Sequence, residues 1–376
     1  MKRLIDICDI QYGYAFDSMC FTEDSSYPQL VRIRDVKRGY SETYYSGNYP
    51  EEYILSEGDL LVGMDGEFNI ARWKSSGALL NQRVCKLIAK VGINGEYIRF
   101  AMTKALKEIE RKTAFVTVKH LSAKELNKLE LDVPKLSEQD RIADTLNRLE
   151  KVIEARQEEL DKLDDLIKAR FVEMFGDIAI GNYKYDTRKL GDVANVGSSH
   201  RVFTTEFVKK GIPFYRGTEI GELANGNKPA EPFYISEEHY NRLVYNDTKP
   251  QVGDLLLPSI CNKGQVWMVD TDEPFYYKDG RVLCISPDRE IFDTKYLEYF
   301  MRAKTLVEYP KLGSGSTFAE FKIFMLKNID VLIPPRELQE QFSMFVHQVD
   351  KSKVAVQKAL DETQMLFDSL MQKYFA

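Results

Sequence analysis

The residues with the clearest catalytic potential are two carboxylates and a lysine in the last third of the chain. Asp288 follows a proline, and Glu320 and Lys322 form a Glu-x-Lys pair further on. Two carboxylates and a lysine could hold Mg²⁺ and activate water for phosphodiester cleavage. In an internal repeat of the chain, however, the positions of Glu320–Lys322 are occupied by His120, Leu121 and Ser122. Short motifs of this kind also arise by chance, so a Mg²⁺-dependent nuclease is only an alternative hypothesis.

Other catalytic signatures are absent from the sequence. It contains no G-x-x-x-x-G-K-[ST] loop, no G-x-G-x-x-G after a strand and no G-x-S-x-G elbow. The glycine-rich segment 313–317 lacks the lysine that phosphate binding needs, which favours a loop. The segment Ile333-Pro-Pro-Arg336 lacks the polar leader and the aromatic residue of an amino-methyltransferase motif. These absences favour a chain that binds rather than catalyses.

Composition indicates a water-soluble protein of the reducing cytoplasm. The five cysteines are scattered without a C-x-x-C pair and the four histidines are dispersed, so we expect reduced thiols and no metal site. No apolar run approaches the roughly 18 residues that span a bilayer, and no signal sequence is evident. The net charge of −6 is unevenly spread: residues 1–130 hold 19 basic and 18 acidic side chains, whereas residues 131–178 hold 8 and 13. The overall charge therefore says little about a local groove.

The chain repeats itself. The segment V-P-K-L-S-E-Q-D-R-I at 133–142 aligns with I-P-P-R-E-L-Q-E-Q-F at 333–342, and this alignment continues without a gap to Phe175 and Phe375. Upstream, G-D-L-L at 58–61 matches 253–256, Arg32 matches Arg216, and Arg83 matches Arg281. The last pair favours a shared structural role, such as a buried ion pair. The order is therefore domain, helix, domain, helix, with boundaries at 1–132, 133–178, 179–332 and 333–376.

Each predicted long helix carries apolar side chains at alternating spacings of four and three residues, which is typical of a coiled-coil seam. We expect the first helix to begin with Ser137 as its N-cap and to end near Gly176. The seam of the first helix comprises Ile142, Leu146, Leu149, Ile153, Arg156, Leu160, Leu163, Ile167, Arg170 and Met174. The seam of the second comprises Phe342, Val346, Val349, Lys353, Val356, Leu360, Thr363, Phe367, Leu370 and Tyr374. We expect the two helices to pair, although packing of each on its own domain is an alternative.

The two domains between the helices show a mixed pattern. Residues 29–34 and 265–270 alternate like strands, and G-D-L-L indicates a turn into a buried strand. Helices are expected at 96–112 and 294–307. The expected fold class is α+β: two similar domains with mostly antiparallel sheets, alternating with two long coiled-coil helices.

The motifs P-K-L-S-E-Q-D-R-I-A at 134–143 and P-P-R-E-L-Q-E-Q-F at 334–342, with this domain order, resemble the specificity subunit of type I restriction-modification systems. The resemblance covers essentially the whole chain. It implies two target recognition domains, each reading one half of a split site in double-stranded DNA, and antiparallel helices that dock two methyltransferase subunits. It further implies that adenine-N6 methylation with S-adenosylmethionine, and cleavage by restriction subunits using ATP and Mg²⁺, belong to those partners and that this chain holds no cofactor. The acidic net charge departs from what a DNA-binding chain suggests.

Side chains that match base edges or phosphates are the candidates for DNA contact. In the first domain these are Arg32, Arg34, Lys37, Arg38, Arg72, Lys74, Lys119 and His120. In the second domain they are His200, Arg201, Arg216, Asn262, Lys263 and Lys322. Any single one of them could equally be a solvated surface charge.

Two other hypotheses stay open on the sequence alone. A self-contained nuclease would use Asp288, Glu320 and Lys322 and would cleave DNA with Mg²⁺. A coiled-coil scaffold that reads no sequence would use only the two long helices.

Overall fold

The computed structural model describes residues 1–66, 68–112, 121–244, 249–312 and 319–375. Contacts divide the chain into two units: Met1–Glu158 together with Gln357–Ala376, and Glu159–Val356. Each long helix therefore contributes one part to each unit. The four segments expected from the sequence describe the order of domains and helices along the chain. Their boundaries as domains stay a prediction.

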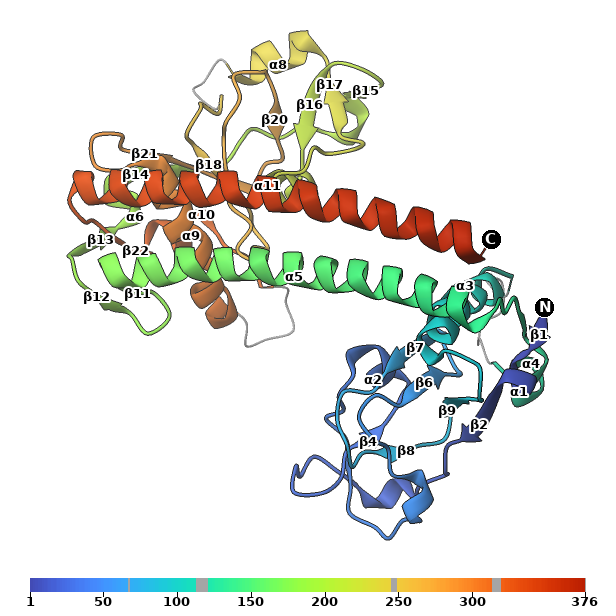
Figure 1. Cartoon of the computed structure of the whole chain (residues 1–376). Helices are drawn as coiled ribbons and strands as arrows, with labels where there is room; N and C mark the ends of the chain where they lie inside the picture. Colours follow the sequence, from blue (N-terminus) through green and yellow to red (C-terminus); the bar gives the residue numbers. More distant parts are fainter. Residues whose placement is uncertain (67, 113–120, 245–248, 313–318, 376) are drawn as a thin grey trace. The chain divides into compact units, whose positions relative to one another are not determined.

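The first unit is built on a four-stranded antiparallel sheet in the order β2-β9-β6-β7 (Figure 1). Its strands are β1 (Lys2–Arg3), β2 (Cys8–Tyr12), β3 (Phe21–Thr22), β4 (Leu30–Val31), β5 (Tyr44–Tyr45), β6 (Leu60–Gly63), β7 (Asn69–Arg72), β8 (Leu79–Leu80), β9 (Val84–Ala89) and β10 (Glu130–Leu131). Its helices are α1 (Leu4–Ile7), α2 (Ile33–Arg38), α3 (Gly95–Lys112), α4 (Ala123–Lys128) and the 3-10 turns Ser18–Cys20 and Glu51–Tyr53. The buried face of α3 packs on this sheet, and Phe367 and Leu370 of the second long helix join the same core.

The second unit repeats this frame with a sheet in the order β14-β21-β18-β19. Its strands are β11 (Gly176–Asp177), β12 (Asn182–Tyr183), β13 (Thr187–Lys189), β14 (Ala194–Gly197), β15 (Phe207–Val208), β16 (Ile212–Tyr215), β17 (Phe233–Ile235), β18 (Leu255–Pro258), β19 (Trp267–Met268), β20 (Tyr276–Tyr277), β21 (Val282–Pro287) and β22 (Asp330–Leu332). Its helices are α6 (Leu190–Val193), α7 (Gly217–Ala224), α8 (Glu237–Leu243), α9 (Thr294–Glu308), α10 (Ile323–Lys327) and the 3-10 turns Thr204–Glu206 and Tyr309–Leu312. A second four-stranded sheet, β15-β17-β16-β20, packs with α8 around Phe214 and Tyr276.

Hydrogen bonds outside the regular strands confirm that the two units are copies of one frame. The N–H of Met64 donates to the carbonyl of Arg83 at 2.9 Å, and that of Ser259 donates to Arg281 at 2.8 Å. The same Met64 and Ser259 carbonyls accept from Leu121 and Phe321, both at 2.7 Å. The expected fold class is confirmed: between the strands of the described residues, pairing is antiparallel except for the pairs β4-β8 and β16-β20.

Two expected strands are shorter than the sequence pattern indicated. Of residues 29–34, only Leu30–Val31 form a strand, because helix α2 begins at Ile33. Of residues 265–270, only Trp267–Met268 are paired as a strand. The start of α2 ends the first strand, whereas beyond the second Val269 still exchanges backbone hydrogen bonds with Gly253 and Asp254. The expected helices at 96–112 and 294–307 are present as α3 and α9.

The long helices are α5 (Leu136–Phe175) and α11 (Arg336–Phe375). The expected N-cap at Ser137 was wrong: α5 begins at Leu136, and the Lys135 carbonyl accepts from the N–H groups of Glu138 and Gln139. The expected end was right, since Gly176 follows Phe175 with a φ of 96°, a conformation that glycine adopts without strain. Among the described residues, no helix is both long and apolar enough to cross a membrane.

Every seam position expected in the two long helices is buried or half-buried. In the first unit the Arg141 guanidinium lies over the Tyr374 ring at 5.6 Å. In the second unit Lys353 Nζ donates to Asp164 Oδ1 at 2.7 Å, and the Phe171 and Phe342 rings are 5.4 Å apart. In the second unit the later α5 residue, Phe171, contacts the earlier α11 residue, Phe342. The two helices therefore run antiparallel there.

A buried glutamine joins each long helix to the preceding domain. The Gln139 side chain accepts from the Asn94 N–H at 2.9 Å and donates to the Pro134 carbonyl at 2.8 Å. Gln339 accepts from the Asp293 N–H at 2.9 Å and donates to the Pro334 carbonyl at 2.9 Å. Both glutamines are almost fully buried. The glutamine shared by the two repeated motifs therefore has a structural function.

Replacing Gln339 with leucine is expected to lower the free energy of unfolding by about 3 kcal/mol, because a buried N–H and two carbonyls lose their partner. Urea denaturation of the full chain measures this change. Gln341→Leu is the matched control, since Gln341 is exposed on the same helix and should change stability by less than about 0.5 kcal/mol. Equal effects of the two substitutions would contradict this role.

Candidate nucleic-acid interface

The same short helix start occurs in both units. Arg32 precedes α2 and Arg216 precedes α7, and both residues have extended backbones. The N–H of Arg32 donates to Asp35 Oδ2 at 2.9 Å, and that of Arg216 donates to Glu219 Oε2 at 2.8 Å. An acidic residue at the third helical position thus caps each helix from within the core.

The two arginines differ in what their guanidinium groups contact. Glu219 also binds the Arg216 guanidinium, with Nε to both carboxylate oxygens at 3.2 Å, and the group lies over the Phe233 ring at 4.5 Å. Burial alone would raise the pKa of Glu219, but its hydrogen bonds from Arg216 lower it below the ordinary value. Asp35 is one methylene shorter, and its carboxylate accepts from the Arg32 N–H without pairing with the Arg32 guanidinium. Within the described parts of the chain, the Arg32 guanidinium has no ion pair.

Helix α2 gathers most of the candidates of the first unit. Arg32 and Arg34 line a cavity of about 720 Å³ with Tyr44, Glu23 and Glu42. Arg34 Nε lies 3.7 Å from Asp35 Oδ1, a loose contact for an exposed pair. One short exposed segment therefore offers arginines whose donors are largely available.

The rest of the basic cluster lies close by. Lys37 and Arg38 are exposed on α2, and the Lys74 stem covers Gly39 at the end of that helix. Lys37 and Lys74 also line a second cavity, of about 690 Å³. The candidates Lys119 and His120 lie outside the described residues.

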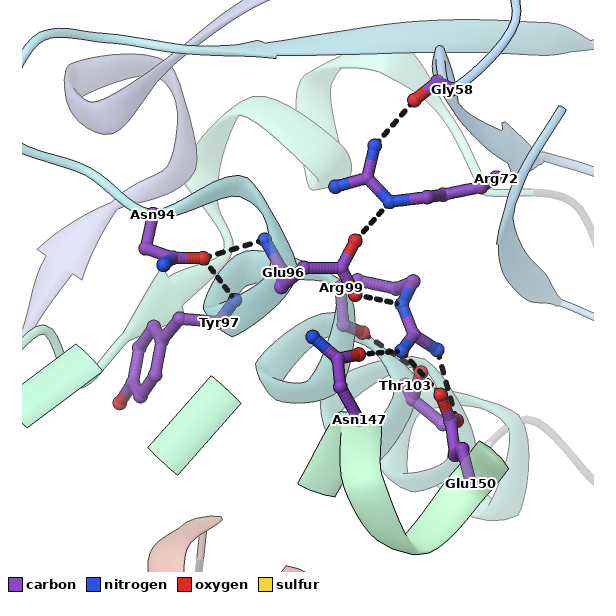
Figure 2. A network of polar contacts seen from close by, with 9 residues as sticks. All are labelled: Gly58, Arg72, Asn94, Glu96, Tyr97, Arg99, Thr103, Asn147 and Glu150. Atoms are coloured by element: carbon purple, nitrogen blue, oxygen red, sulfur yellow. Dashed lines mark hydrogen bonds and ion pairs between the residues drawn. The ribbon is translucent and has the colours of Figure 1, made fainter. Parts of the chain in front are cut away.

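Arg72, another candidate, is held within the first unit. Figure 2 shows its guanidinium pointing toward Glu96 and the Gly58 carbonyl, and both contacts are hydrogen bonds. Glu96 in turn accepts from Arg99, which reaches Glu150 and Asn147 of α5 at 3.0 Å. This chain of charges links β7, α3 and α5. The contacts of Arg72 favour a structural role, and contact with DNA stays an untested prediction.

In the second unit the candidates are more dispersed. His200 and Arg201 are exposed after β14, and Arg201 lies over the Phe203 ring at 5.3 Å. Asn262 and Lys263 are exposed in the turn between β18 and β19. Lys322 donates to Glu320. Arg216 lines a cavity of about 460 Å³ with Gln265, Lys278 and Arg281, none of which was among the sequence candidates for DNA contact.

The shared role expected for Arg83 and Arg281 is an ion pair in both units. Arg83 Nη1 donates to Asp65 at 2.6 Å, and Arg281 Nη1 donates to Glu320 at 2.7 Å. The pairs are not buried, since the arginine side chains are 54% and 57% exposed.

A pattern that could have revealed the caps of α2 and α7 was present in the sequence: R-x-x-D at 32–35 and R-x-x-E at 216–219.

The geometry does not support the alternative nuclease site. Glu320 is paired with Arg281 and Lys322, and the hydrogen bond from Lys322 holds the pKa of Glu320 below its ordinary value. Asp288 follows the other end of β21, and seven steps along the strand at about 3.3 Å each place it roughly 23 Å from Arg281. In the described part of the chain, no group of three or more His, Cys, Asp and Glu residues is arranged to hold a metal ion.

Comparisons with known proteins agree with this architecture. The family model described as the type I restriction modification DNA specificity domain matches residues 1–164 and 182–363. The EcoBI specificity subunit of Escherichia coli is 27% identical, over 98% of this chain and 84% of that protein. The MjaIX specificity subunit of Methanocaldococcus jannaschii is 23% identical, over 85% of this chain and 77% of that protein.

Solved structures share the fold. The S subunit of a type I restriction-modification system from M. genitalium has a TM-score of 0.59 at 14% identity, covering 100% of this chain and 95% of that one. A chain from a structural study of complex assembly and conformational transition in the type I system has a TM-score of 0.53 at 18% identity, covering 100% and 96%. With the family match over both repeats, the chain belongs to the family of type I restriction-modification DNA specificity proteins.

Proposed function

We propose that this chain is the DNA-reading subunit of a type I restriction-modification complex and performs no catalysis itself. The proposal rests on a structural frame that occurs twice with different surfaces. The backbone hydrogen bonds of Met64 and Ser259 repeat in the two units, whereas the side chains at the starts of α2 and α7 differ. A duplicated frame with two distinct surfaces suits a split site whose halves differ. The two units would each read one half in double-stranded DNA.

Arg32 is the residue best suited to read a base in the first unit. A guanidinium can donate two parallel hydrogen bonds to guanine in the major groove, provided that its donors are not already used. The Arg32 guanidinium meets that condition among the described residues, whereas Glu219 occupies that of Arg216. The two units would therefore read their half-sites with different groups.

Partners are proposed from the long helices. Helix α11 exposes apolar side chains away from its seam: Met344 and Val354 in the second unit, and Met365 and Leu366 in the first, each at least 50% exposed. Contiguous exposed apolar patches mark interaction surfaces, and these side chains are the candidates for one. We assign them to two adenine-N6 methyltransferase subunits, with restriction subunits completing the complex in the cytoplasm.

The cofactors would act in those partners. The sequence of this chain has no phosphate loop and no amino-methyltransferase motif, so S-adenosylmethionine, ATP and Mg²⁺ are assigned to the methyltransferase and restriction subunits. The chain itself would hold no cofactor. Its contribution would be to select the DNA and to position the methyltransferases.

Methylome sequencing tests the proposal. A split methylated-adenine motif should appear only in cells that carry the gene, and replacing residues 1–132 with the domain of a relative should change one half only. A change in both halves would contradict the assignment of one half to each unit. Mg²⁺-dependent cleavage by the purified chain would support the nuclease, and a complex with no sequence preference would support the scaffold.

A further inference from the structure

A cationic cavity lies beside the start of α7 in the second unit. Its walls include Arg216, Lys278 and Arg281, together with the polar side chains of Thr218 and Gln265, and its volume is about 460 Å³. Cations gathered around one small cavity can attract an anion locally even in a chain whose net charge is −6, to the extent that they are not neutralised.

The three cations are not equally available. Arg216 is neutralised by Glu219, and Arg281 by Glu320, which also pairs with Lys322. Lys278 is exposed, and its Nζ makes no ion pair with any residue that the structure describes. Lys278 is therefore the group that brings an unneutralised positive charge to the cavity.

The backbone of Lys278 is nevertheless fixed. Its N–H donates to the Tyr215 carbonyl at 2.9 Å, which extends the parallel pairing of β16 and β20. Its carbonyl accepts from the Val282 N–H at 3.0 Å. These contacts hold the Lys278 backbone next to the chain segment that enters α7, and the residue lines the cavity.

Gly217 shapes the opposite wall. A Cβ on this residue would lie 3.1 Å from the Pro258 Cβ, so glycine allows α7 to start close to β18. Gly217 and Thr218, the first two residues of α7, thereby line the cavity.

The first unit lacks this arrangement. The residue that follows β8, as Lys278 follows β20, is Asn81, and the first residue of α2 is Ile33 rather than glycine. Among the residues that the structure describes, the lysine and the glycine that line this cavity are therefore not repeated at the equivalent positions of the first unit.

We propose that this cavity binds one backbone phosphate of the DNA, with Lys278 as the essential group. The inference rests on the proposed function and names what one site contacts. A phosphate is favoured over a base because an ammonium is a point charge without the paired donors that distinguish bases. The two arginines at the same place, Arg216 and Arg281, are already bound by Glu219 and Glu320.

The test compares Lys278→Gln with Lys228→Gln in the complex with the methyltransferase subunit. Lys228 is an exposed lysine beyond the other end of α7, so the charge change is the same. Binding is measured by fluorescence anisotropy at several salt concentrations, with a duplex carrying the methylated site and with a scrambled duplex. Lys278→Gln should weaken binding to both duplexes about tenfold, the effect of losing one charge-assisted hydrogen bond. The slope of log K against log salt should fall by about 0.9, and Lys228→Gln should change neither quantity.

A second measurement identifies the phosphate itself. Neutral methylphosphonate linkages are placed singly along the half-site that the second unit reads. One of these linkages should weaken DNA binding by the wild type about tenfold and leave DNA binding by Lys278→Gln unaffected. Lys278→Arg should retain most of the affinity of the wild type for the unmodified duplex. Equal binding by Lys278→Gln and Lys228→Gln would overturn the proposal. A changed methylated motif in Lys278→Gln would also overturn it, because it would indicate that Lys278 reads a base. A wild-type complex without preference for its own site would contradict the proposed function instead.

Discussion

Replacing Arg32 with alanine is expected to reduce methylation of the cognate site by 10- to 100-fold and to relax one base pair of the first half-site. The expectation follows from a guanidinium that has no ion pair in the described part of the chain and lines an open cavity on α2. Loss of a bidentate contact to guanine removes about 1–3 kcal/mol of discrimination. The measurement is single-turnover methylation of duplexes that carry each base in turn, with methylome sequencing of cells expressing the variant.

Asp35→Glu provides a second form of the same test, without removing the arginine. A glutamate at position 35 should reach the Arg32 guanidinium as Glu219 reaches that of Arg216, and should withdraw it from the DNA. We expect a loss of the same kind as in Arg32→Ala, but smaller. Arg216→Ala serves as the matched comparison: because its fork is already occupied, the base sequence of the second half-site should stay unchanged, and affinity is measured separately because Arg216 also lines the phosphate cavity. Relaxation of the second half with an intact first half would refute this assignment.

The parts of the fold that could be predicted are those governed by a strong periodicity. The alternation of four and three residues from Ile142 onward predicted both seams, and the glycine at 176 predicted the end of α5. The repeat itself exposed the shared frame, because residues that hold the same hydrogen bonds, such as Gln139 and Gln339, keep their identity in both copies. Local signals of this kind need no knowledge of distant neighbours.

The candidate site was less accessible to sequence reasoning. In the amino-acid sequence Arg72 and Arg32 are indistinguishable as basic residues. In the structure Glu96 pairs with Arg72, whereas the short side chain of Asp35 leaves the Arg32 guanidinium available. Lys278 gave no signal because its importance depends on the start of α7, which lies far from it along the chain. The partners of long charged side chains are set by tertiary contacts, which the sequence pattern does not encode.

Inserting seven residues into both long helices is expected to widen the spacer between the half-sites. The insertions belong after Leu160 in α5 and after Val356 in α11, since the ion pair of Asp164 with Lys353 shows that these positions lie at nearly the same level. Seven residues are close to two turns, so the seam faces are retained, and each helix gains about 10.5 Å. At 3.4 Å per base pair this gain corresponds to at most about three base pairs.

We expect the helix lengths to determine the number of base pairs between the half-sites, because each long helix is unbroken and supplies residues to both units. The two half-site sequences should stay the same, since neither α2 nor α7 is altered. Insertion into α5 alone is the control: it shifts one helix against the other, so the contacts of Arg141 with Tyr374 and of Asp164 with Lys353 cannot form together, and stability should fall. Methylated sites are then sequenced for the double insertion. An active variant that keeps the original spacer would show that the helices only dock the methyltransferases, because a helix that measures the gap cannot lengthen without changing it.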